Sequence, residues 1–340
     1  MAFFRHHGGS LDIARRLFPG APEPFLDLST GIAPIPYPLP EPPPDRLRRL
    51  PEAHEERDLR EAAAKAYGIR DLDHVVAAPG SQILISLLPR LFPAREVAIL
   101  GPTYGEHAAS WRAAGVAVRE ETEVDAWVDA AGAPGRAMVV CNPNNPDGRR
   151  LPPSVLAGVA TRCAAAGGLL VVDEAFADLE PEPLSVAPLV PLPGLVVLRS
   201  FGKSYGLAGV RLGFLLAEAS LAASVSGALG PWAVSGPALW AGRQALSDHE
   251  WREAAAGRLA SDADRLDGLL TAAGLRVLGG TRLFRLVRAE GAEAIFLRLA
   301  RAGILVRPFG GDRSDLLRFG IPGDPETWRR LRTGLGRPAA

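Results

Sequence analysis

Short apolar segments alternate with longer helical ones from about residue 70 to residue 225. The segments "HVVAAPGS", "EVAIL", "AMVVC", "GLLVVDEA" and "GLVVLRS" are rich in β-branched residues, and stretches with helical character such as "QILISLLPRLF" lie between them. Strands this apolar are buried on both faces, which is the position of parallel strands covered by helices on each side. The pattern therefore predicts an α/β fold with a mostly parallel sheet, in a large domain over residues 45–225.

Two further regions flank this large domain. Residues 226–340 contain a long amphipathic segment, 247–274, followed by strand and helix segments typical of a small α+β domain. Residues 1–44 are expected to form an N-terminal arm and part of the small domain. The prolines of residues 25–45 exclude a regular helix there and favour an extended segment across a surface, with a loose linker as the alternative.

Composition excludes several classes of protein. The chain has 38 basic and 38 acidic residues among 340, without a basic cluster of the kind that binds nucleic acid. No apolar stretch reaches the roughly 18 residues that a membrane span needs, and the charged N-terminus does not resemble a signal peptide. Two cysteines cannot form a disulfide framework. We therefore expect a soluble, cytoplasmic protein with no nucleic-acid or membrane partner.

Polar residues follow the apolar segments at the points where ligands of parallel sheets collect, beyond the carboxyl ends of the strands. Ser81 and Gln82, after "APG", begin a helix whose first N–H groups suit an anion, although most such turns bind nothing. Tyr104, in "GPTYGEH", is either an aromatic wall for a planar ligand or a cap on the core. Asn145, in "CNPNNPDG", is either an amide directed at a ligand or part of a tight loop.

Two further residues carry reactive groups. Asp173 ends the apolar run of "GLLVVD", where a buried carboxylate is costly unless a ligand or a structural partner pairs with it. Lys203, in "RSFGKSYGLAGVRLG", is one of only two lysines in a chain whose other cationic side chains are nearly all arginine. Lysine, unlike arginine, can lose its proton and attack a carbonyl. The other lysine, Lys65, lies in an ordinary helical stretch and is expected to face solvent.

Ser200 and Arg211 flank Lys203 with a hydroxyl and a guanidinium, both of which suit a phosphate. An amine for a Schiff base, a phosphate clamp and a buried carboxylate together indicate a pyridoxal phosphate site. The chain carries no comparable pattern of metal ligands, so no metal is expected.

Three motifs, "NPNNPDG", "DEAF" and "SFGKSYGLAGVRLG", occur in this order. With them, nearly the whole chain resembles the fold type I pyridoxal-phosphate enzymes of the class I/II aminotransferase superfamily. The resemblance implies a homodimer, a Schiff base between Lys203 and the cofactor, and a pyridinium proton held by Asp173. The other cofactor contacts that it implies are Asn145 with the phenolic oxygen, Tyr104 with the ring face, and Ser81, Gln82, Ser200 and Arg211 with the phosphate.

Two positions depart from the family pattern. Phe176 of "DEAF" stands where many members have a tyrosine that also bonds the phenolic oxygen. Leu50 stands where many have a tyrosine that reaches the phosphate across the dimer. Both departures weaken the prediction of an ordinary aminotransferase, whereas the other contacts still support cofactor binding.

The N-terminal segments "HHGGSLDIARRLF" and "FLDLSTGIAPIPYPLP" resemble those of the threonine-phosphate decarboxylases of cobalamin biosynthesis. In this resemblance His7 of "HGG" matches a family histidine, although a disordered polar N-terminus is the alternative. The superfamily resemblance places Arg318 on the substrate α-carboxylate, Arg307 and His7 are the cationic candidates for the substrate phosphate, and Gly31 is also expected at the substrate. Ala33 replaces a family asparagine, so a side-chain contact from that position is absent. The implied reaction converts L-threonine O-3-phosphate to aminopropanol phosphate and carbon dioxide.

Two alternatives stay open. The first is histidinol-phosphate aminotransferase or a related aminotransferase, because the bond that breaks depends on how Arg318 orients the carboxylate relative to the cofactor ring. The second is a non-catalytic ligand-binding homologue. Lys203 and Asp173 argue against the second, since a protein that only recognises a ligand has no use for a Schiff-base amine.

Overall fold

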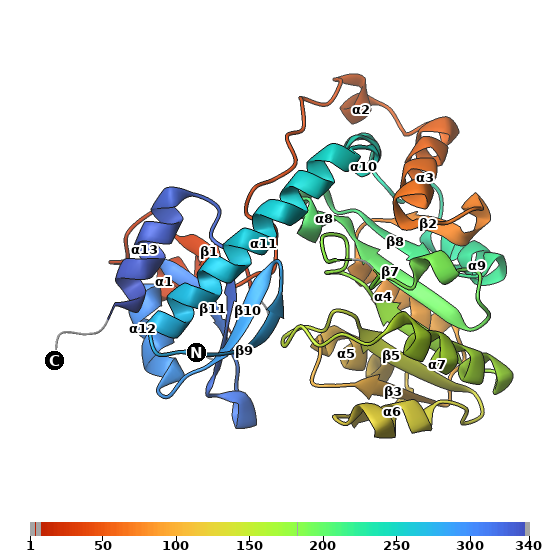
Figure 1. The fold of residues 1–340 in the computed structure, drawn as a ribbon. Helices are drawn as coiled ribbons and strands as arrows, with labels where there is room; N and C mark the ends of the chain where they lie inside the picture. The colour runs from red at the N-terminus through yellow and green to blue at the C-terminus, as the bar shows by residue number, and fades with distance from the viewer. Residues whose placement is uncertain (1–3, 5–7, 182, 337–340) are drawn as a thin grey trace. The chain divides into compact units, whose positions relative to one another are not determined.

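A computed structural model describes residue 4, residues 8–181 and residues 183–336, and its contacts divide the chain into two compact units (Figure 1). The first unit consists of residues 1–35, 146–149 and 253–340, and the second of residues 36–145 and 150–252. The two units are groups of residues with many contacts among themselves, and such a division does not identify independently folding domains. The domain boundaries expected from the sequence, after residues 44 and 225, therefore remain a prediction.

The second unit is built on a seven-stranded sheet of order β2-β8-β7-β6-β5-β3-β4. The pairs among β3 to β7 are parallel, whereas β8 pairs antiparallel with both β2 and β7. The strands are β2 (Val75–Ala78), β3 (Glu96–Leu100), β4 (Ala117–Glu121), β5 (Arg136–Cys141), β6 (Leu169–Asp173), β7 (Leu195–Ser200) and β8 (Gly213–Leu216). The expectation of an α/β fold with a mostly parallel sheet is confirmed.

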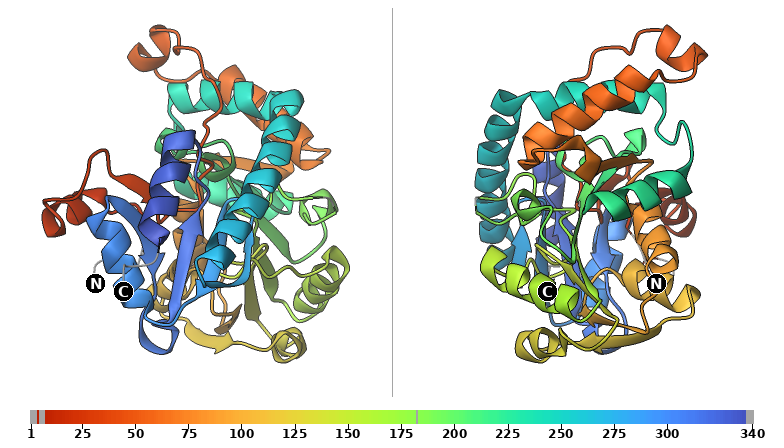
Figure 2. Two further views of the ribbon diagram at one scale, coloured as in Figure 1. Left: turned by 60° about the vertical axis from the view of Figure 1, so that its left-hand side comes forward. Right: turned by 90° about the vertical axis from the view of Figure 1, so that its right-hand side faces the viewer.

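Helices cover both faces of this sheet (Figures 1 and 2). Because successive strand residues point to opposite faces, Val139 packs with α4, α5 and α9 on one face and Val140 with α3, α7 and α10 on the other. The helices of the second unit are α2 (Asp45–Arg48), α3 (Ala53–Tyr67), α4 (Ser81–Leu91), α5 (Gly105–Ala113), α6 (Val124–Ala130), α7 (Pro153–Ala165), α8 (Phe201–Ser204), α9 (Ala219–Leu229) and α10 (Gly236–Ser247).

The first unit contains a mixed five-stranded sheet of order β1-β11-β12-β10-β9. β1 and β11 are parallel, and the other neighbours are antiparallel. Its elements are α1 (Leu11–Leu17), β1 (Leu26–Leu28), α11 (His249–Ala272), β9 (Arg276–Thr281), β10 (Phe284–Arg288), α12 (Ala292–Arg301), β11 (Ile304–Pro308), β12 (Leu316–Gly320) and α13 (Pro325–Leu335). The sheet and its helices confirm a small α+β part, and α11, which starts in the second unit, is the long helix expected over 247–274.

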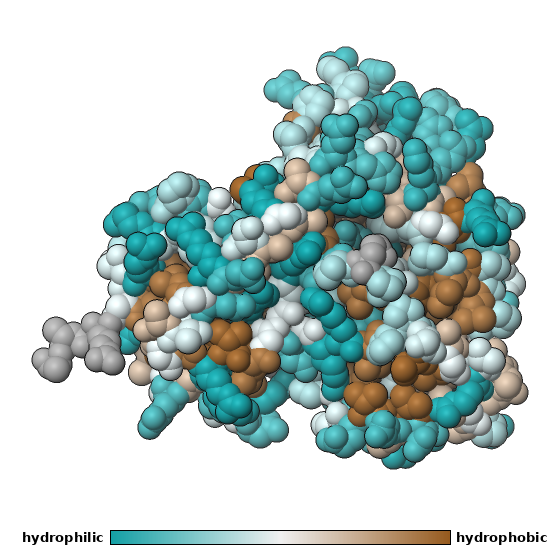
Figure 3. Space-filling model, viewed as in Figure 1, coloured by the Kyte–Doolittle hydropathy of each residue, from teal (hydrophilic) through white to brown (hydrophobic). Residues whose placement is uncertain are grey.

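The proline-rich segment 25–45 lacks a regular helix over most of its length, as its sequence predicts. Residues 26–28 form β1, residues 29–44 form no regular helix or strand, and α2 begins at Asp45. In the view of Figure 3 hydrophilic residues cover most of the surface and apolar residues form separate patches. None of the helices in the described part of the chain is long and apolar enough to cross a membrane.

Candidate active site

The carboxyl ends of the central strands carry five of the twelve site residues that the sequence indicated. Asp173 is the last residue of β6, Ser200 is the last residue of β7, and Lys203 lies in α8 directly after β7. Asn145 follows β5, and Tyr104 lies between β3 and α5. Because parallel neighbours end at the same edge of a sheet, these side chains belong to one edge, the usual position of a ligand site in such folds.

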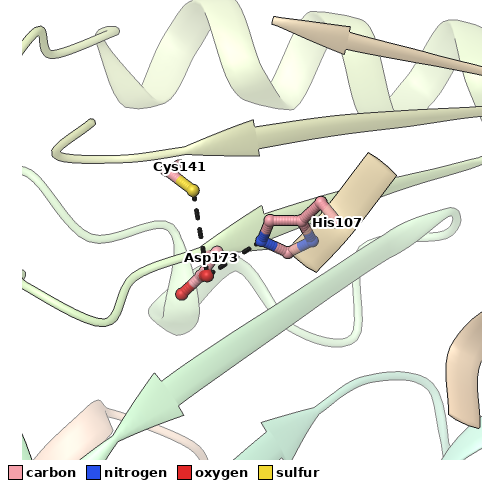
Figure 4. A group of neighbouring side chains, drawn as sticks. All are labelled: His107, Cys141 and Asp173. Atoms are coloured by element: carbon pink, nitrogen blue, oxygen red, sulfur yellow. Dashed lines mark hydrogen bonds and ion pairs between the residues drawn. The ribbon is translucent and has the colours of Figure 1, made fainter. Parts of the chain in front are cut away.

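Asp173 is a buried carboxylate, 5% exposed, whose two oxygens both have partners (Figure 4). Oδ2 lies 2.9 Å from Nε2 of His107 and 3.8 Å from Sγ of Cys141, and Oδ1 accepts a hydrogen bond from the N–H of Ala175 at 3.0 Å. Burial acts to raise the pKa of Asp173, but the hydrogen bond and charge of His107, with the charge of Lys203, hold it below its usual value. Asp173 is therefore ionised at neutral pH and can hold a protonated ring nitrogen.

His107, in α5, has no motif that indicated it from the sequence. Its imidazole is buried at 1% exposure against Asp173 and Cys141. Burial acts to lower the pKa of His107, but the charges and hydrogen bonds of Cys141 and Asp173 raise it to about 10. His107 therefore supplies the positive charge that keeps Asp173 ionised. The one available signal was its position a helical turn after Tyr104.

The raised pKa of His107 predicts a pH-dependent stability. Because the folded-state pKa, about 10, lies above the ordinary 6.5, the contribution of His107 is fully present below pH 6.5 and is lost as the pH rises through about 10. We expect the melting temperature to fall over this alkaline range. Replacement of His107 by Gln, which keeps a donor but not the charge, should lower the melting temperature at neutral pH by roughly 6–20 °C and flatten the slope. Circular dichroism melts across this range measure both, and an unchanged slope in H107Q would contradict the assignment.

The start of α4 lies beside the guanidinium of Arg211. The N-cap residue is Gly80, with φ +90°, and it has no side chain that could cap the first N–H groups of the helix. A Cβ on Gly80 would lie 2.7 Å from Nη2 of Arg211. Arg211 itself has φ 56°, a left-handed conformation that is rare for a side chain of this kind. Uncapped helix N–H groups and a guanidinium at one place suit a phosphate.

Gly213 brings Ser81 and Ser200 together. Ser200 is paired with Gly213 across β7 and β8. A Cβ on Gly213 would lie 2.4 Å from the backbone nitrogen of Ser81, so only glycine fits at this position. The structure thus groups the four residues expected at the cofactor phosphate, which are Ser81, Gln82, Ser200 and Arg211.

A series of contacts connects this phosphate end to the buried carboxylate. Tyr104 donates a hydrogen bond from Oη to Oε1 of Gln82 at 3.0 Å, and its ring meets the imidazole of His107 edge to face at 6.1 Å. His107 in turn contacts Asp173. The contacts thus connect hydrogen-bond donors for a phosphate, the aromatic ring of Tyr104 and the carboxylate of Asp173, which can pair with a ring nitrogen. The residues present therefore fit pyridoxal phosphate.

Lys203 and Phe176 lie together on the same edge of the sheet. Nζ of Lys203 is 5.3 Å from the centre of the Phe176 ring, and Phe176 is buried at 6% exposure. The phenyl ring therefore packs against the amine but offers no hydroxyl to a ligand. Leu50, the other departure from the family pattern, is 60% exposed.

Asn142 and Asn144 stabilise the loop that carries Asn145 through side-chain hydrogen bonds. The sequence indicated these two asparagines only as part of a tight loop. The side chain of Asn142 accepts from the N–H of Leu151 at 2.8 Å and donates to the carbonyl of the same residue at 3.2 Å. Asn144 donates from Nδ2 to the carbonyl of Pro102 at 3.0 Å. These bonds fix the loop after β5 and join it to the loop after β3.

The expected substrate residues that the structure describes lie in the first unit. Arg307 of β11 and Arg318 of β12 are direct partners in an antiparallel pair. Arg318 is 3% exposed and donates from Nη2 to the carbonyl of Ser29 at 2.7 Å. Burial, followed by the charge of Arg307, lowers the pKa of Arg318 to about 9, and Asp27 acts in the opposite direction. Gly31, which follows Ser29 by two residues, is also buried.

Like charges directly opposite each other destabilise a sheet. The Arg307–Arg318 pair places two like charges opposite each other in this sheet. His7, the remaining expected substrate residue, lies outside the described residues.

Comparison with known proteins decides the family. Residues 45–335 match the family described as aminotransferase class I and II. The chain is a member of the class I and II aminotransferase family. Members of this family are pyridoxal-phosphate enzymes, in agreement with the residues that this family member places at the carboxyl ends of β5, β6 and β7.

Several curated proteins resemble this family member over most of their length. It is 47% identical over 336 residues to a threonine-phosphate decarboxylase of a Sinorhizobium species, covering 97% of each chain. It is 42% identical over 331 residues to a threonine-phosphate decarboxylase of Pseudomonas aeruginosa, covering 97% of this chain and 96% of the relative. A histidinol-phosphate aminotransferase of Shewanella amazonensis is 33% identical over 282 residues, covering 78% of this chain and 77% of the relative.

Solved structures confirm the fold type I architecture. Histidinol-phosphate aminotransferase from Sinorhizobium meliloti, in complex with pyridoxal 5'-phosphate, superimposes on this family member with a TM-score of 0.79 at 22% identity, covering 95% and 92% of the two chains. L-threonine-O-3-phosphate decarboxylase from Porphyromonas gingivalis gives a TM-score of 0.74 at 21% identity, covering 91% and 98%. At these identities the likeness establishes the fold alone.

Proposed function

We propose that this protein is a pyridoxal-phosphate-dependent decarboxylase that converts L-threonine O-3-phosphate to aminopropanol phosphate and carbon dioxide. The observation that carries the proposal is the cross-strand pair of Arg307 and Arg318, since a substrate with a carboxylate and a phosphate provides one anion for each guanidinium. The two relatives named threonine-phosphate decarboxylase, at 47% and 42% identity, support this choice of substrate.

The cofactor and the chain have separate tasks in this proposal. Pyridoxal phosphate, when bound, supplies a ring that accepts the electron pair left at the substrate α-carbon. Asp173 keeps the proton on the ring nitrogen, because its own pKa is held low by His107 and Lys203. Lys203 binds the cofactor through Nζ and is the proposed donor of the proton that replaces carbon dioxide at the α-carbon.

We assign the substrate carboxylate to Arg318 and the substrate phosphate to Arg307, together with His7. The guanidinium of Arg318 is oriented by the carbonyl of Ser29 and lies 5.0 Å from the centre of the Phe284 ring. A buried, fixed fork of this kind suits the two oxygens of a carboxylate. Gly31, in the segment that follows Ser29, is the proposed place where backbone approaches the substrate.

Replacement of Arg307 by Gln tests the division between the two arginines. Loss of a charge-assisted hydrogen bond is expected to raise KM for threonine phosphate about 10–150-fold, with little change for unphosphorylated threonine. Replacement of Arg318 by Gln should instead raise KM for both compounds, because both carry the carboxylate. Steady-state release of carbon dioxide from each compound measures the difference. An equal loss for both compounds in the Arg307 variant would show that Arg307 does not bind the phosphate.

The second candidate is histidinol-phosphate aminotransferase, favoured by the relative at 33% identity. One pair of assays separates the two activities. Threonine phosphate should release carbon dioxide, whereas histidinol phosphate with 2-oxoglutarate should give no glutamate. Glutamate without carbon dioxide would overturn the proposal. A purified protein that is colourless and unaffected by added pyridoxal phosphate would instead indicate a non-catalytic homologue.

We also propose a homodimer. Three large apolar residues of the second unit are highly exposed, Leu47 at 74%, Leu50 at 60% and Trp232 at 57%. α2 lies beside the start of α10, since a Cβ on Gly236 would be 2.5 Å from the carbonyl of Arg46 (Figure 2). Exposed apolar residues in one region suit burial against a second copy. Sedimentation equilibrium should give twice the chain mass of 35.9 kDa, and a monomer at micromolar concentration would contradict the dimer.

A further inference from the structure

A buried cluster of charged side chains adjoins the cofactor residues in the second unit. Arg199 donates from Nη1 to Oε2 of Glu174 and from Nη2 to Oδ1 of Asp178. The three side chains are 6%, 0% and 4% exposed. The guanidinium lies 4.3 Å from the centre of the Tyr67 ring, which contributes a further contact from α3. One arginine thus joins two carboxylates away from water.

The carboxylate of Glu174 has a second set of partners. Oε1 accepts from the N–H of Val186 at 2.7 Å, and Oε2 accepts from Oγ of Ser185 at 2.6 Å. The side chain therefore connects the residue directly after β6 to residues 185 and 186. Both of its oxygens are used, so its position is fixed in more than one direction.

The cluster is continuous in sequence with both proposed cofactor anchors. Glu174 directly follows Asp173, and its N–H donates to the carbonyl of Leu198 in β7 at 2.9 Å. Arg199 is followed by Ser200 and, four residues after Arg199, by Lys203. The bond between Glu174 and Arg199 therefore ties together the ends of β6 and β7, at the residue directly after Asp173 and the residue four positions before Lys203.

Stability alone does not explain a cluster of this kind. Removing charges from water costs free energy that their mutual attraction often does not recover, and neutral replacements of similar shape are often as stable. Directional hydrogen bonds between charged groups instead hold the side chains, and the strand ends that carry them, in one geometry.

We propose that the cluster of Glu174, Asp178 and Arg199 is a positioning device that fixes Asp173 and Lys203 relative to each other for cofactor binding. The three residues are positioning residues, to which we assign no contact with cofactor or substrate. The proposal rests on the roles of Asp173 and Lys203 toward the cofactor, and not on which reaction follows.

The test uses the neutral triple variant Glu174→Gln, Asp178→Asn, Arg199→Met. We expect it to fold, with a melting temperature within a few degrees of the parent. The dissociation constant for pyridoxal phosphate, from fluorescence titration of the apoprotein, should rise about tenfold or more, and kcat should fall about 100-fold because the anchors are misplaced. The pH midpoint of the visible absorbance of the bound cofactor should also shift. The single variant Arg199→Lys keeps the charge and both carboxylates. It should bind pyridoxal phosphate more tightly than the triple variant and less tightly than the parent.

A matched control is the ion pair between Glu96 and Arg136, which joins β3 and β5 at the first residues of both strands. Nη2 of Arg136 lies 2.7 Å from Oε2 of Glu96, and the two residues are register partners. The double variant Glu96→Gln, Arg136→Met should lower stability at most and leave the dissociation constant for pyridoxal phosphate unchanged.

Two outcomes would overturn the proposal. One is a folded triple variant with the dissociation constant and absorbance midpoint of the parent. The other, decisive if the triple variant does not fold, is a folded Glu174→Gln single variant that shows neither change. A protein that binds pyridoxal phosphate but releases no carbon dioxide from threonine phosphate would overturn the proposed reaction and leave this test intact.

Discussion

A Lys203→Ala protein is expected to lose about 10⁴-fold in the rate of carbon dioxide release and to retain no cofactor after borohydride reduction. Among the described residues, Lys203 is the one lysine at the edge of the sheet where Asp173 and the phosphate-binding residues lie. The chain uses arginine for almost all its other cationic groups, and a guanidinium cannot attack a carbonyl at neutral pH. No neighbouring side chain can therefore replace the amine.

Lys65 provides the matched control, because it is the only other lysine of the chain and is exposed on α3. The parent and a Lys65→Ala protein should each gain one phosphopyridoxyl group on the peptide that contains Lys203. Mass spectrometry of the reduced proteins, with and without proteolysis, measures the gain and its position. A parent protein without this adduct, or a Lys203→Ala protein with the parent rate, would show that the cofactor site is wrong.

Several of the residues that the sequence indicated stand at the end of a buried strand or directly after it. Apolar runs such as "GLLVVD" identify parallel strands, and strand ends in parallel sheets meet at one edge. Asp173, Ser200 and Asn145 can be grouped for this reason from the sequence alone. The glycines of "APGSQ" and "VRLG" made the close approach of α4 to β8 possible, although their contact itself was not predictable.

The missed features depend on tertiary packing. His107 reaches Asp173 because one face of α5 packs on the sheet, and a single histidine on a helix carries no sign of which face is inward. β4, with the sequence "AVREE", is the last strand of the sheet, next to β3, and an edge strand with exposed side chains shows no apolar run. Residues 146–149 belong to the first unit because Gly148 packs on Gly280, a contact between distant segments.

The second large effect is expected from Asp173→Asn, which should lower kcat about 10²–10⁴-fold while the protein still binds pyridoxal phosphate. An amide has nearly the shape of the carboxylate and can still accept the hydrogen bond from Ala175. It carries no charge, so it does not keep a proton on the ring nitrogen. The electron-accepting capacity of the cofactor should therefore fall, whereas Lys203 and the residues at the phosphate continue to hold it.

The stability of this variant needs a separate argument, because breaking a buried ion pair by removing one partner costs about 3–5 kcal/mol when the other charge stays. The other charge need not stay, since His107 can release its proton. Without the carboxylate, which raises the pKa of His107, the lowering effect of burial is larger relative to the remaining contributions, and the pKa of His107 falls. We therefore expect Asp173→Asn to fold at neutral pH with a reduced melting temperature.

Two comparisons decide whether the rate loss comes from the charge of Asp173 or from a disturbed fold. Cys141→Ala removes the contact 3.8 Å from Oδ2 without altering the carboxylate, and should change kcat less than about tenfold. His107→Gln removes the main neighbouring charge, but Lys203 and the N–H of Ala175 still lower the pKa of Asp173, so this variant should reduce kcat less than Asp173→Asn does. If Asp173→Asn loses no more activity than His107→Gln, measured as carbon dioxide release at saturating cofactor, the carboxylate is structural. A much larger loss in the asparagine variant assigns the ring-nitrogen proton to Asp173.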